Sequence, residues 1–241
     1  MPVSIAIIIP TYNEEKNIEK LIKTIKRYIK NALILIVDDS SNKKIKKIID
    51  KKKLDVVYFN RGKKSGRGSA VIFGLKKIIN KEKIKTFVEM DADLSHDPAE
   101  LKRNINFFKK NSLDLLIASR YLKKSKIIYW TISRKIISFL ANYLARKLLG
   151  IPISDYTNGY RIYSKRSVKK IIKNCGKIGD GFIILSEILL EIYRNNYKID
   201  EIHSIFVNRQ RGESSVNLSL ILQSFFGLIK LYLKKRKLNI L

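Results

Sequence analysis

The chain is poor in cysteine, in acidic residues and in long apolar runs. A single cysteine, Cys175, cannot form an intramolecular disulfide or a cysteine-based zinc site. No stretch of about 18 or more apolar residues occurs, so no membrane-spanning helix is predicted. The first residues enter an apolar run without a basic leader or a cleavage motif, which argues against a secretory signal. We therefore expect a soluble protein of a reducing compartment.

Basic residues outnumber acidic ones by far. The 241 residues include 50 Lys and Arg against 21 Asp and Glu, a formal net charge of +29. This excess favours a polyanionic partner or surface, such as nucleic acid, anionic lipid or phosphorylated small molecules. Lysine runs such as residues 51–53 are equally typical of solvated helix faces. With 45% hydrophobic residues the chain can bury a sizeable core, and its length fits one large domain or a domain with an appendage.

Strand-length apolar runs alternate with helical periodicity through the first half of the chain. The predicted strands span residues 3–9, 33–37, 55–59, 85–90 and 114–118. A helix-start signal precedes the last of them, with Asp97 as N-cap, Pro98 in the first helical position and Glu100 in the third. This alternation predicts an α/β, Rossmann-like fold with a mainly parallel sheet and helices on both faces.

Polar clusters follow four of these strands. They are Pro10-Thr11-Tyr12-Asn13-Glu14, Asp38-Asp39-Ser40-Ser41, Asp91-Ala92-Asp93 and Ser119-Arg120-Tyr121. Any one alone is explained by turn chemistry, since Asp, Asn and Ser favour turns and N-caps. Ligands of parallel sheets bind beyond the carboxyl ends of the strands. Together the clusters predict one site at that edge.

The pair Asp91 and Asp93 is the centre of the predicted chemistry. Carboxylates two residues apart on extended chain point the same way and can reach one cation. Oxygen ligands suit Mg²⁺ or Mn²⁺ rather than zinc, and such a metal stabilises a diphosphate leaving group. A solvated acidic turn is the alternative. For His96, a structural hydrogen bond is favoured over a role as ligand or base.

A basic glycine-rich loop, residues 62–70, opens a predicted helix. Its spacing matches neither a Walker phosphate loop nor a dinucleotide-binding fingerprint. Its backbone amides could still contribute to binding an anion.

Two segments of the second half are apolar and basic at once, at residues 126–149 and 218–233. Both are typical of helices that lie in a membrane interface with snorkelling Lys and Arg, although ordinary core helices are the alternative. The basic residues that follow the second segment favour an anionic membrane surface.

The ordered motifs together resemble the inverting GT-A glycosyltransferases of family 2, and among them the dolichyl-phosphate or polyprenyl-phosphate mannosyltransferases. Besides the four clusters, the resemblance rests on the following segments. They are Gly66-Arg67-Gly68-Ser69-Ala70, Leu94-Ser95-His96-Asp97-Pro98, Arg134-Lys135-Ile136-Ile137-Ser138, Asp155-Tyr156-Thr157-Asn158-Gly159-Tyr160-Arg161 and Phe206-Val207-Asn208-Arg209 with Gly212-Glu213-Ser214. The resemblance covers nearly the whole chain.

The resemblance also implies roles for single residues. It implies a donor pocket formed by Pro10, Tyr12, Glu14, Val37, Asp39, Asp91, Ala92, Asp93, Arg120 and Arg209. A Mg²⁺ or Mn²⁺ ion would be held by Asp91, Asp93 and Ser95, and the acceptor phosphate by Arg120, Arg134 and Ser138. Asp91, Asp93, Arg120 and Arg134 are the expected catalytic residues. The family pattern has Lys after Gly-Glu-Ser, whereas this chain has Ser215, so a donor-phosphate contact is either missing or supplied by another base such as Arg211.

The function implied is transfer of mannose from GDP-mannose to dolichyl or polyprenyl phosphate at the cytoplasmic face of a membrane. Residues 1–215 would form the catalytic domain, with an interfacial helical insertion at about residues 124–150, and residues 216–241 a basic membrane-surface helix. An anchoring partner subunit is a second route to the membrane. Alternatives within the fold are another donor, such as UDP-glucose, or a hydroxyl acceptor with Glu187 or Asp155 as base. Nucleic acid is not expected as a partner, because the aromatics fall mainly in apolar helices and acids crowd the strand ends.

Overall fold

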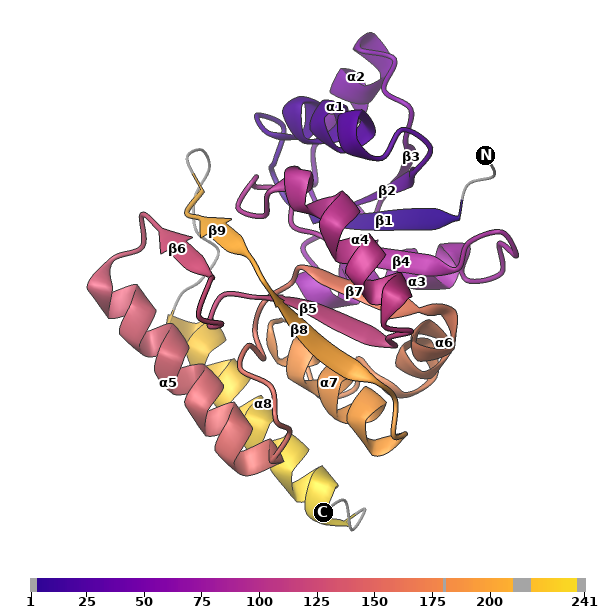
Figure 1. Cartoon of the computed structure of the whole chain (residues 1–241). Helices are drawn as coiled ribbons and strands as arrows, with labels where there is room; N and C mark the ends of the chain where they lie inside the picture. The colour runs from indigo at the N-terminus through magenta and orange to yellow at the C-terminus, as the bar shows by residue number, and fades with distance from the viewer. Residues whose placement is uncertain (1–3, 180, 210–217, 238–241) are drawn as a thin grey trace.

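A mixed seven-stranded sheet forms the centre of the computed structural model, which describes residues 4–179, 181–209 and 218–237 (Figure 1). Its strand order is β3-β2-β1-β4-β7-β5-β8. These strands are β1 (Ile5–Thr11), β2 (Leu33–Asp38), β3 (Val57–Asn60), β4 (Thr86–Glu89), β5 (Leu115–Ser119), β7 (Arg161–Ser164) and β8 (Ile199–His203). The five strands predicted from apolar runs are all present, with ends shifted by a few residues.

All strands of this sheet run parallel except β7, which is inserted antiparallel between β4 and β5. Because two antiparallel pairings restore the direction, β1, β2, β4 and β5 all end at the same edge. The mainly parallel sheet expected from the sequence is therefore confirmed, and its strand ends meet as required for a common site.

Helices cover both faces of the sheet and form two separate cores. One face packs against α1 (Ile18–Tyr28), α2 (Lys44–Lys51) and α4 (Leu101–Lys110), and the other against α3 (Arg67–Ile78), α6 (Lys165–Asn174) and α7 (Ile183–Arg194). Alternate residues of β1 supply the two cores, with Ile8 in one and Ile7 and Ile9 in the other, as the two-residue period of a strand dictates. Both faces are apolar because both are covered.

The start of α4 confirms the helix-start signal. The Asp97 carboxylate accepts a hydrogen bond from the Ala99 N–H (2.9 Å). One 3-10 turn, η1 (Pro98–Glu100), then leads into α4.

The composition of residues 126–149 suggested one continuous helix, but the structure divides this segment into a strand and a helix. Residues Lys126–Ile128 form β6, which pairs with β9 (Ile205–Val207) in a second, two-stranded sheet. The helix α5 (Ile132–Leu149) begins only at Thr131, whose hydroxyl accepts the Arg134 N–H as an N-cap. Strand pairing with β9 therefore takes the first residues out of the helix, and Trp130 lies in the connection.

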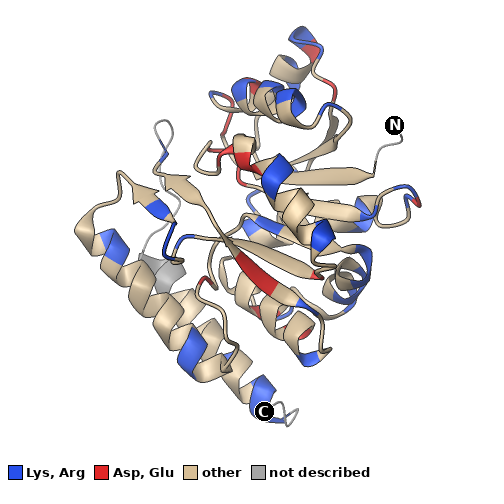
Figure 2. Cartoon of the chain, in the orientation of Figure 1, with Lys and Arg blue, Asp and Glu red and all other residues tan. Residues whose placement is uncertain are grey.

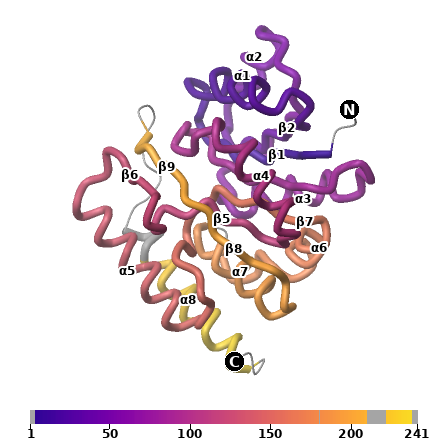
Figure 3. The backbone as a smooth tube through the Cα atoms, in the orientation of Figure 1, coloured from indigo at the N-terminus to yellow at the C-terminus, as the bar shows by residue number. Residues whose placement is uncertain are grey.

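Helices α5 and α8 (Leu218–Lys237) lie side by side at one end of the molecule (Figures 1 and 3). Gly227 lets α8 approach α7, because a β-carbon there would lie 2.6 Å from Ile183 Cγ1. Lys234 of α8 lies 3.5 Å from the buried Glu187 carboxylate of α7. Within the described ranges, no helix has the length and apolar character needed to cross a bilayer.

These two helices expose many large apolar side chains. They are Ile132, Ile136, Ile137, Phe139, Leu140, Tyr143 and Leu144 of α5, and Leu222, Phe225, Phe226, Ile229 and Leu233 of α8. At the exposed positions of α1, α2, α4 and α6, by contrast, Lys and Arg predominate (Figure 2). Leu228 and Leu231 of α8 face the core instead. The two helices are thus partly core elements and partly an exposed apolar surface.

Candidate functional site

The four polar clusters meet at the carboxyl edge of the sheet. The first two are joined by the Asn13 N–H, which donates to Ser40 Oγ (2.8 Å). His96 links the third cluster to the fourth. Its Nε2 contacts Asn158 Oδ1 (2.9 Å), and the Asn158 side chain donates to the carbonyl of Ala118, the residue before Ser119. Arg209, which contacts both Glu14 and Asp93, links the first pair of clusters to the second, so all four lie at one edge of the sheet as predicted.

Both carboxylates of the Asp-x-Asp pair contact arginines. Asp91 Oδ1 accepts from Arg67 Nε (2.7 Å), and Asp93 lies 3.0 Å from Arg209 Nη2. Arg209 also lies 3.9 Å from Glu14, so it neutralises two of the acids that face the crevice. The arginine expected to face a donor diphosphate therefore lies directly against the acids expected to hold the cation.

The acids of the crevice have shifted pKa values with different causes. Burial is the main cause that raises the pKa of Glu14, and the negative charges of Asp93 and Asp91 raise it further. A hydrogen bond from Asn17 and the charge of Arg209 lower the pKa but do not cancel this rise. Burial also acts to raise the pKa of Asp91, but the charge and hydrogen bond of Arg67 together with the other positive charges nearby outweigh it, so the pKa lies below its ordinary value. Asp91 is therefore an anion at neutral pH.

The residues fit a divalent cation that is shared with a substrate. Among the described residues, no three His, Cys, Asp or Glu side chains form a ready-made metal cage. Mg²⁺ bound through substrate phosphates needs only one or two carboxylates, and Asp91 and Asp93 supply these oxygens. Ser95 is buried behind them, and its backbone N–H donates to Asp93 Oδ1 (3.0 Å), so it supports the carboxylate through the main chain.

The expected donor pocket is partly open and partly filled by protein groups. Pro10 and Val37 are paired neighbours in the buried ends of β1 and β2. Asp39 accepts two hydrogen bonds from Arg61 (2.6 and 2.7 Å) and one from the Ser65 N–H. Tyr12 is 42% exposed, and Lys64 Nζ lies 4.8 Å from its ring centre. An exposed aromatic ring at the end of β1 is a suitable stacking surface for a nucleobase.

The glycine-rich loop acts differently from the amide cradle that its composition suggested. Its Ser65 amide binds Asp39, and Arg67 turns inward to contact Asp91, Glu89 and the Gly159 carbonyl. Arg67 was not assigned a role by the sequence analysis. Its position at the first turn of α3, directly after Gly66 with a positive φ of 89°, is the only local signal.

Arg120 is held by Asp155 rather than left free. Arg120 Nε and Nη2 donate to the two oxygens of Asp155 (2.8 and 2.7 Å), and Nη2 also donates to Thr157 Oγ1 (2.6 Å). Burial acts to raise the pKa of Asp155, but the charge of Arg120 and several hydrogen bonds keep it below its ordinary value. The pair fixes the orientation of the Arg120 guanidinium.

Arg134 and Ser138 lie one turn apart at the start of α5, as their spacing predicts. Arg134 Nη1 donates to Asn208 Oδ1 (2.9 Å) in the segment just after β9. The Tyr121 hydroxyl donates to Ser138 Oγ (2.7 Å). Because Ser138 accepts from Tyr121, its own proton remains available to another acceptor. Tyr121 and Asn208 belong to motifs that the sequence analysis quotes, but no individual role was predicted for either residue.

The structure places neither of the two candidate bases in the crevice as a free carboxylate. Asp155 is fully buried and accepts from Arg120, Thr157 and Asn158. Glu187 is buried in α7, where it accepts the Gly176 N–H and faces Lys234. His96 is also buried, and its Nδ1 accepts the Asp91 N–H (3.2 Å). These contacts match the structural interpretation of His96.

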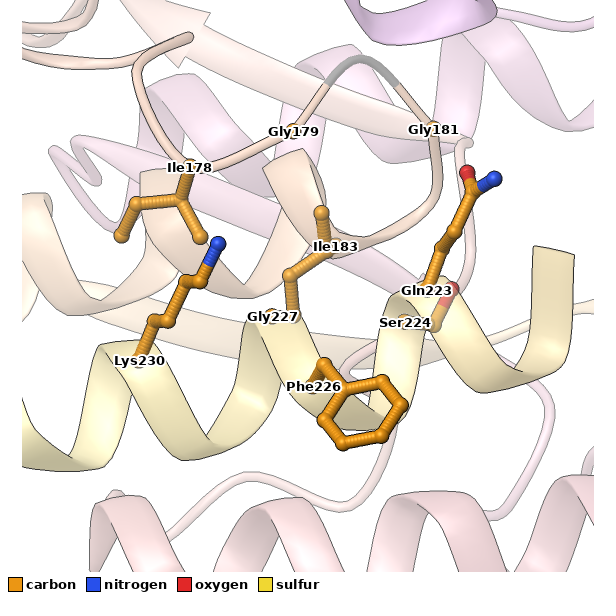
Figure 4. Close-up of a pocket in the computed structure, with 9 residues that line it drawn as sticks. All are labelled: Ile178, Gly179, Gly181, Ile183, Gln223, Ser224, Phe226, Gly227 and Lys230. Atoms are coloured by element: carbon orange, nitrogen blue, oxygen red, sulfur yellow. The ribbon is translucent and has the colours of Figure 1, made fainter.

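A separate hollow of about 220 Å³ lies between α8 and the loop before α7 (Figure 4). Ile178, Ile183, Phe226 and Gly227 give it mostly apolar walls, with Lys230 at one side. No acidic side chain is among its described lining residues, so it is not part of the cation site. Arg211 and Ser215, which bear on donor contacts, lie outside the described residues.

Comparison with known proteins extends the likeness to most of the chain. The family model for glycosyl transferase family 2 matches residues 6–172. A polyprenol monophosphomannose synthase of Mycolicibacterium smegmatis is 31% identical over 224 residues, which are 91% of this chain and 83% of that protein. An undecaprenyl-phosphate mannosyltransferase of Micrococcus luteus is 30% identical over 218 residues, 89% of this chain and 88% of that protein.

Solved structures agree on the fold. Glucosyl-3-phosphoglycerate synthase from Mycobacterium tuberculosis, in complex with Mn²⁺, UDP-glucose and phosphoglyceric acid, matches with a TM-score of 0.66 at 15% identity. The match covers 95% of this chain and 80% of that one, and at this identity it shows the fold alone. Sheet order, strand-end site, family model and relatives agree, and the chain is a GT-A glycosyltransferase that belongs to glycosyl transferase family 2.

Proposed function

We propose that this enzyme transfers mannose from GDP-mannose to a dolichyl or polyprenyl phosphate, with Mg²⁺ or Mn²⁺, at the cytoplasmic face of a membrane. The observation that carries the proposal is the position of Arg134 and Ser138 next to Arg120 and Tyr121 of the strand-end site, on a helix whose outer face is apolar. Two relatives with about 30% identity bear names that specify this acceptor class and mannose.

The acceptor side suits a phosphate rather than a hydroxyl. A phosphate monoester is largely a dianion at neutral pH, since its second pKa is about 6, so it needs no general base. The protein groups then have to orient the attacking oxygen and balance its charge. Arg134 and Ser138 supply donors for that purpose, and the carboxylates of Asp155 and Glu187 are both engaged elsewhere.

The donor side requires a group that accepts charge from the leaving diphosphate. A bound divalent cation supplies this stabilisation, and Asp91 and Asp93 are the residues that would hold it. Arg209 contacts Asp93 and Glu14 and would pair with the diphosphate when the donor binds. Tyr12, Asp39 and the buried ends of β1 and β2 would receive the nucleoside.

The membrane is reached through the apolar surface of α5 and α8. Phe139 of α5 and Phe226 of α8 are exposed, and basic residues such as Lys147 and Arg236 lie on the same helices. Anionic lipid near such residues contributes roughly 1 kcal/mol for each basic side chain. Residues 1–215 then form the catalytic domain and residues 216–241 the appended surface helix. An anchoring partner subunit remains an alternative to direct lipid contact.

The experiment that tests the proposal offers radiolabelled GDP-mannose and UDP-glucose in parallel to a polyprenyl phosphate with Mg²⁺ or Mn²⁺. Label that enters the organic phase from GDP-mannose alone supports the proposal. Transfer from UDP-glucose instead would retain the acceptor and overturn the sugar. Nucleotide binding without transfer to the lipid phosphate would reject the acceptor class or indicate a missing subunit.

A further inference from the structure

Two arginines of the acceptor side share one aromatic ring. The guanidinium carbon of Arg134 lies over the Trp130 ring at 4.4 Å from its centre, and that of Arg120 lies over the same ring at 5.4 Å. Both distances are within the range of a cation–π interaction, for which indole is the strongest partner among side chains. Trp130 itself is only 8% exposed.

Arg134 needs such a partner because its burial and the charges of nearby arginines disfavour its charged form. Burial and then the charges of Arg209 and Arg120 lower the pKa of Arg134 below its ordinary value. Arg120 has Asp155 as counterion, whereas Arg134 hydrogen-bonds the neutral Asn208. A ring face offers negative potential without a competing charge, so it holds Arg134 in place and leaves its charge available to an anion.

The ring is in turn fixed by its neighbours. Phe206 of β9 packs edge-on against Trp130 at 5.3 Å, and Arg120 also lies over Phe206 at 5.5 Å. The indole Nε1 is buried, and it has no hydrogen-bond partner among the described residues. An unpaired buried donor is unfavourable, so the ring face rather than the N–H is what the indole contributes here.

We propose that Trp130 is a positioning residue that holds Arg134, and with it Arg120, in the orientation that receives the acceptor phosphate. This inference rests on the proposed function, because it specifies how that phosphate is gripped. It predicts that loss of the ring weakens binding of the acceptor and leaves binding of the donor unchanged. It also predicts that the effect requires Arg134.

The test compares Trp130→Leu, which removes the ring face, with Trp130→Phe, which keeps one. Affinity for geranyl phosphate is measured by calorimetry, and acceptor KM and kcat are measured by sugar transfer. Trp130→Leu should weaken binding and raise the KM by about tenfold, while Trp130→Phe stays within about threefold of the wild type. Phe59→Leu is the matched control, because it removes a ring that lies under Lys77 at 5.5 Å, away from the acceptor side.

A double-mutant cycle with Arg134→Gln separates positioning from packing. If Trp130 acts through Arg134, Trp130→Leu should change acceptor affinity less than about twofold in the Arg134→Gln background. An unchanged affinity in Trp130→Leu would overturn the inference. So would equal losses in both backgrounds, or parallel losses of donor affinity and melting temperature that Trp130→Phe does not relieve. If the wild-type enzyme binds geranyl phosphate, and the variants change its affinity as expected, but no sugar is transferred to it, the proposed function alone is rejected.

Discussion

Replacement of Asp155 by alanine tests whether this carboxylate is an anchor or a base. The side chain is fully buried and pairs with Arg120, which is itself buried. Removing one partner of a buried ion pair leaves an uncompensated charge, and such changes cost roughly 3–5 kcal/mol. For a chain of 241 residues this corresponds to a fall in melting temperature of about 6–20 °C.

The assay is urea unfolding followed by fluorescence, with Asp50→Ala as the control. Asp50 pairs with Lys46 one helical turn away, and both side chains are about half exposed. Such a surface pair contributes only about 0.3–0.5 kcal/mol. If Asp155→Ala lowers the free energy of unfolding by less than about 1 kcal/mol but greatly reduces activity, Asp155 is not a structural anchor and is again a candidate base.

The same pair predicts how the stability depends on pH. The pKa of Asp155 is lowered in the folded protein from its ordinary value of 3.8. A lowered carboxyl pKa stabilises the fold above the unfolded pKa, and this contribution is lost as pH falls through the folded pKa. The stability difference between wild type and Asp155→Ala should therefore be constant near neutral pH and shrink in acid below about pH 4. A constant difference down to pH 2 would contradict the assignment.

Three further changes test other parts of the structure. Asp93→Asn should abolish sugar transfer without unfolding the chain, because the neutral amide lacks the negative charge that holds a divalent cation; retained metal-dependent transfer would remove Asp93 from the site. Gly227→Val should speed proteolysis of α8, since its β-carbon would lie 2.6 Å from Ile183 Cγ1, and an unchanged rate would argue against this packing. Phe139→Glu should reduce sedimentation with anionic vesicles, since Phe139 is 57% exposed on α5. Tyr28→Glu on α1 carries the same change of charge and should sediment as the wild type does, and equal binding of both variants would exclude the α5 surface.

Local signals were sufficient for most of the sheet and for the location of the site. Apolar runs predicted β1, β2, β4 and β5, because strands buried on both faces need continuous apolar residues. The strand β7 was not predicted, since it has only four residues and begins with Arg161. This arginine is fully buried because the carbonyls of Tyr156, Asn158 and Leu185 accept its hydrogen bonds. Those partners depend on the fold and leave no pattern in the local sequence.

The sequence did not predict which arginines pair with which carboxylates. The contact of Arg61 with Asp39 spans 22 residues, and that of Arg67 with Asp91 spans 24. In a chain with 50 basic residues, composition alone gives no reason to choose these arginines over the neighbouring lysines. The selection follows from the turn at Gly66 and from the end of β4, which bring Arg67 and Asp91 together.

The two sides of α5 would allow one helix to contact both a lipid and its phosphate, as the proposed function requires. Inward positions recur at Arg134, Ser138 and Asn142, four residues apart, and Asn142 Nδ2 donates to the Ser138 carbonyl (2.7 Å). The outward positions Ile136 and Phe139 follow at the complementary spacing and are exposed. Because a helix turns by about 100° per residue, its rotation about its axis sets both faces together. If the outer face lies on lipid, the inner face presents Arg134 and Ser138 at the depth where a prenyl phosphate meets water. The phosphate would then reach the crevice without leaving the interface, and the proposed transfer to a lipid would need no spanning helix among the described residues.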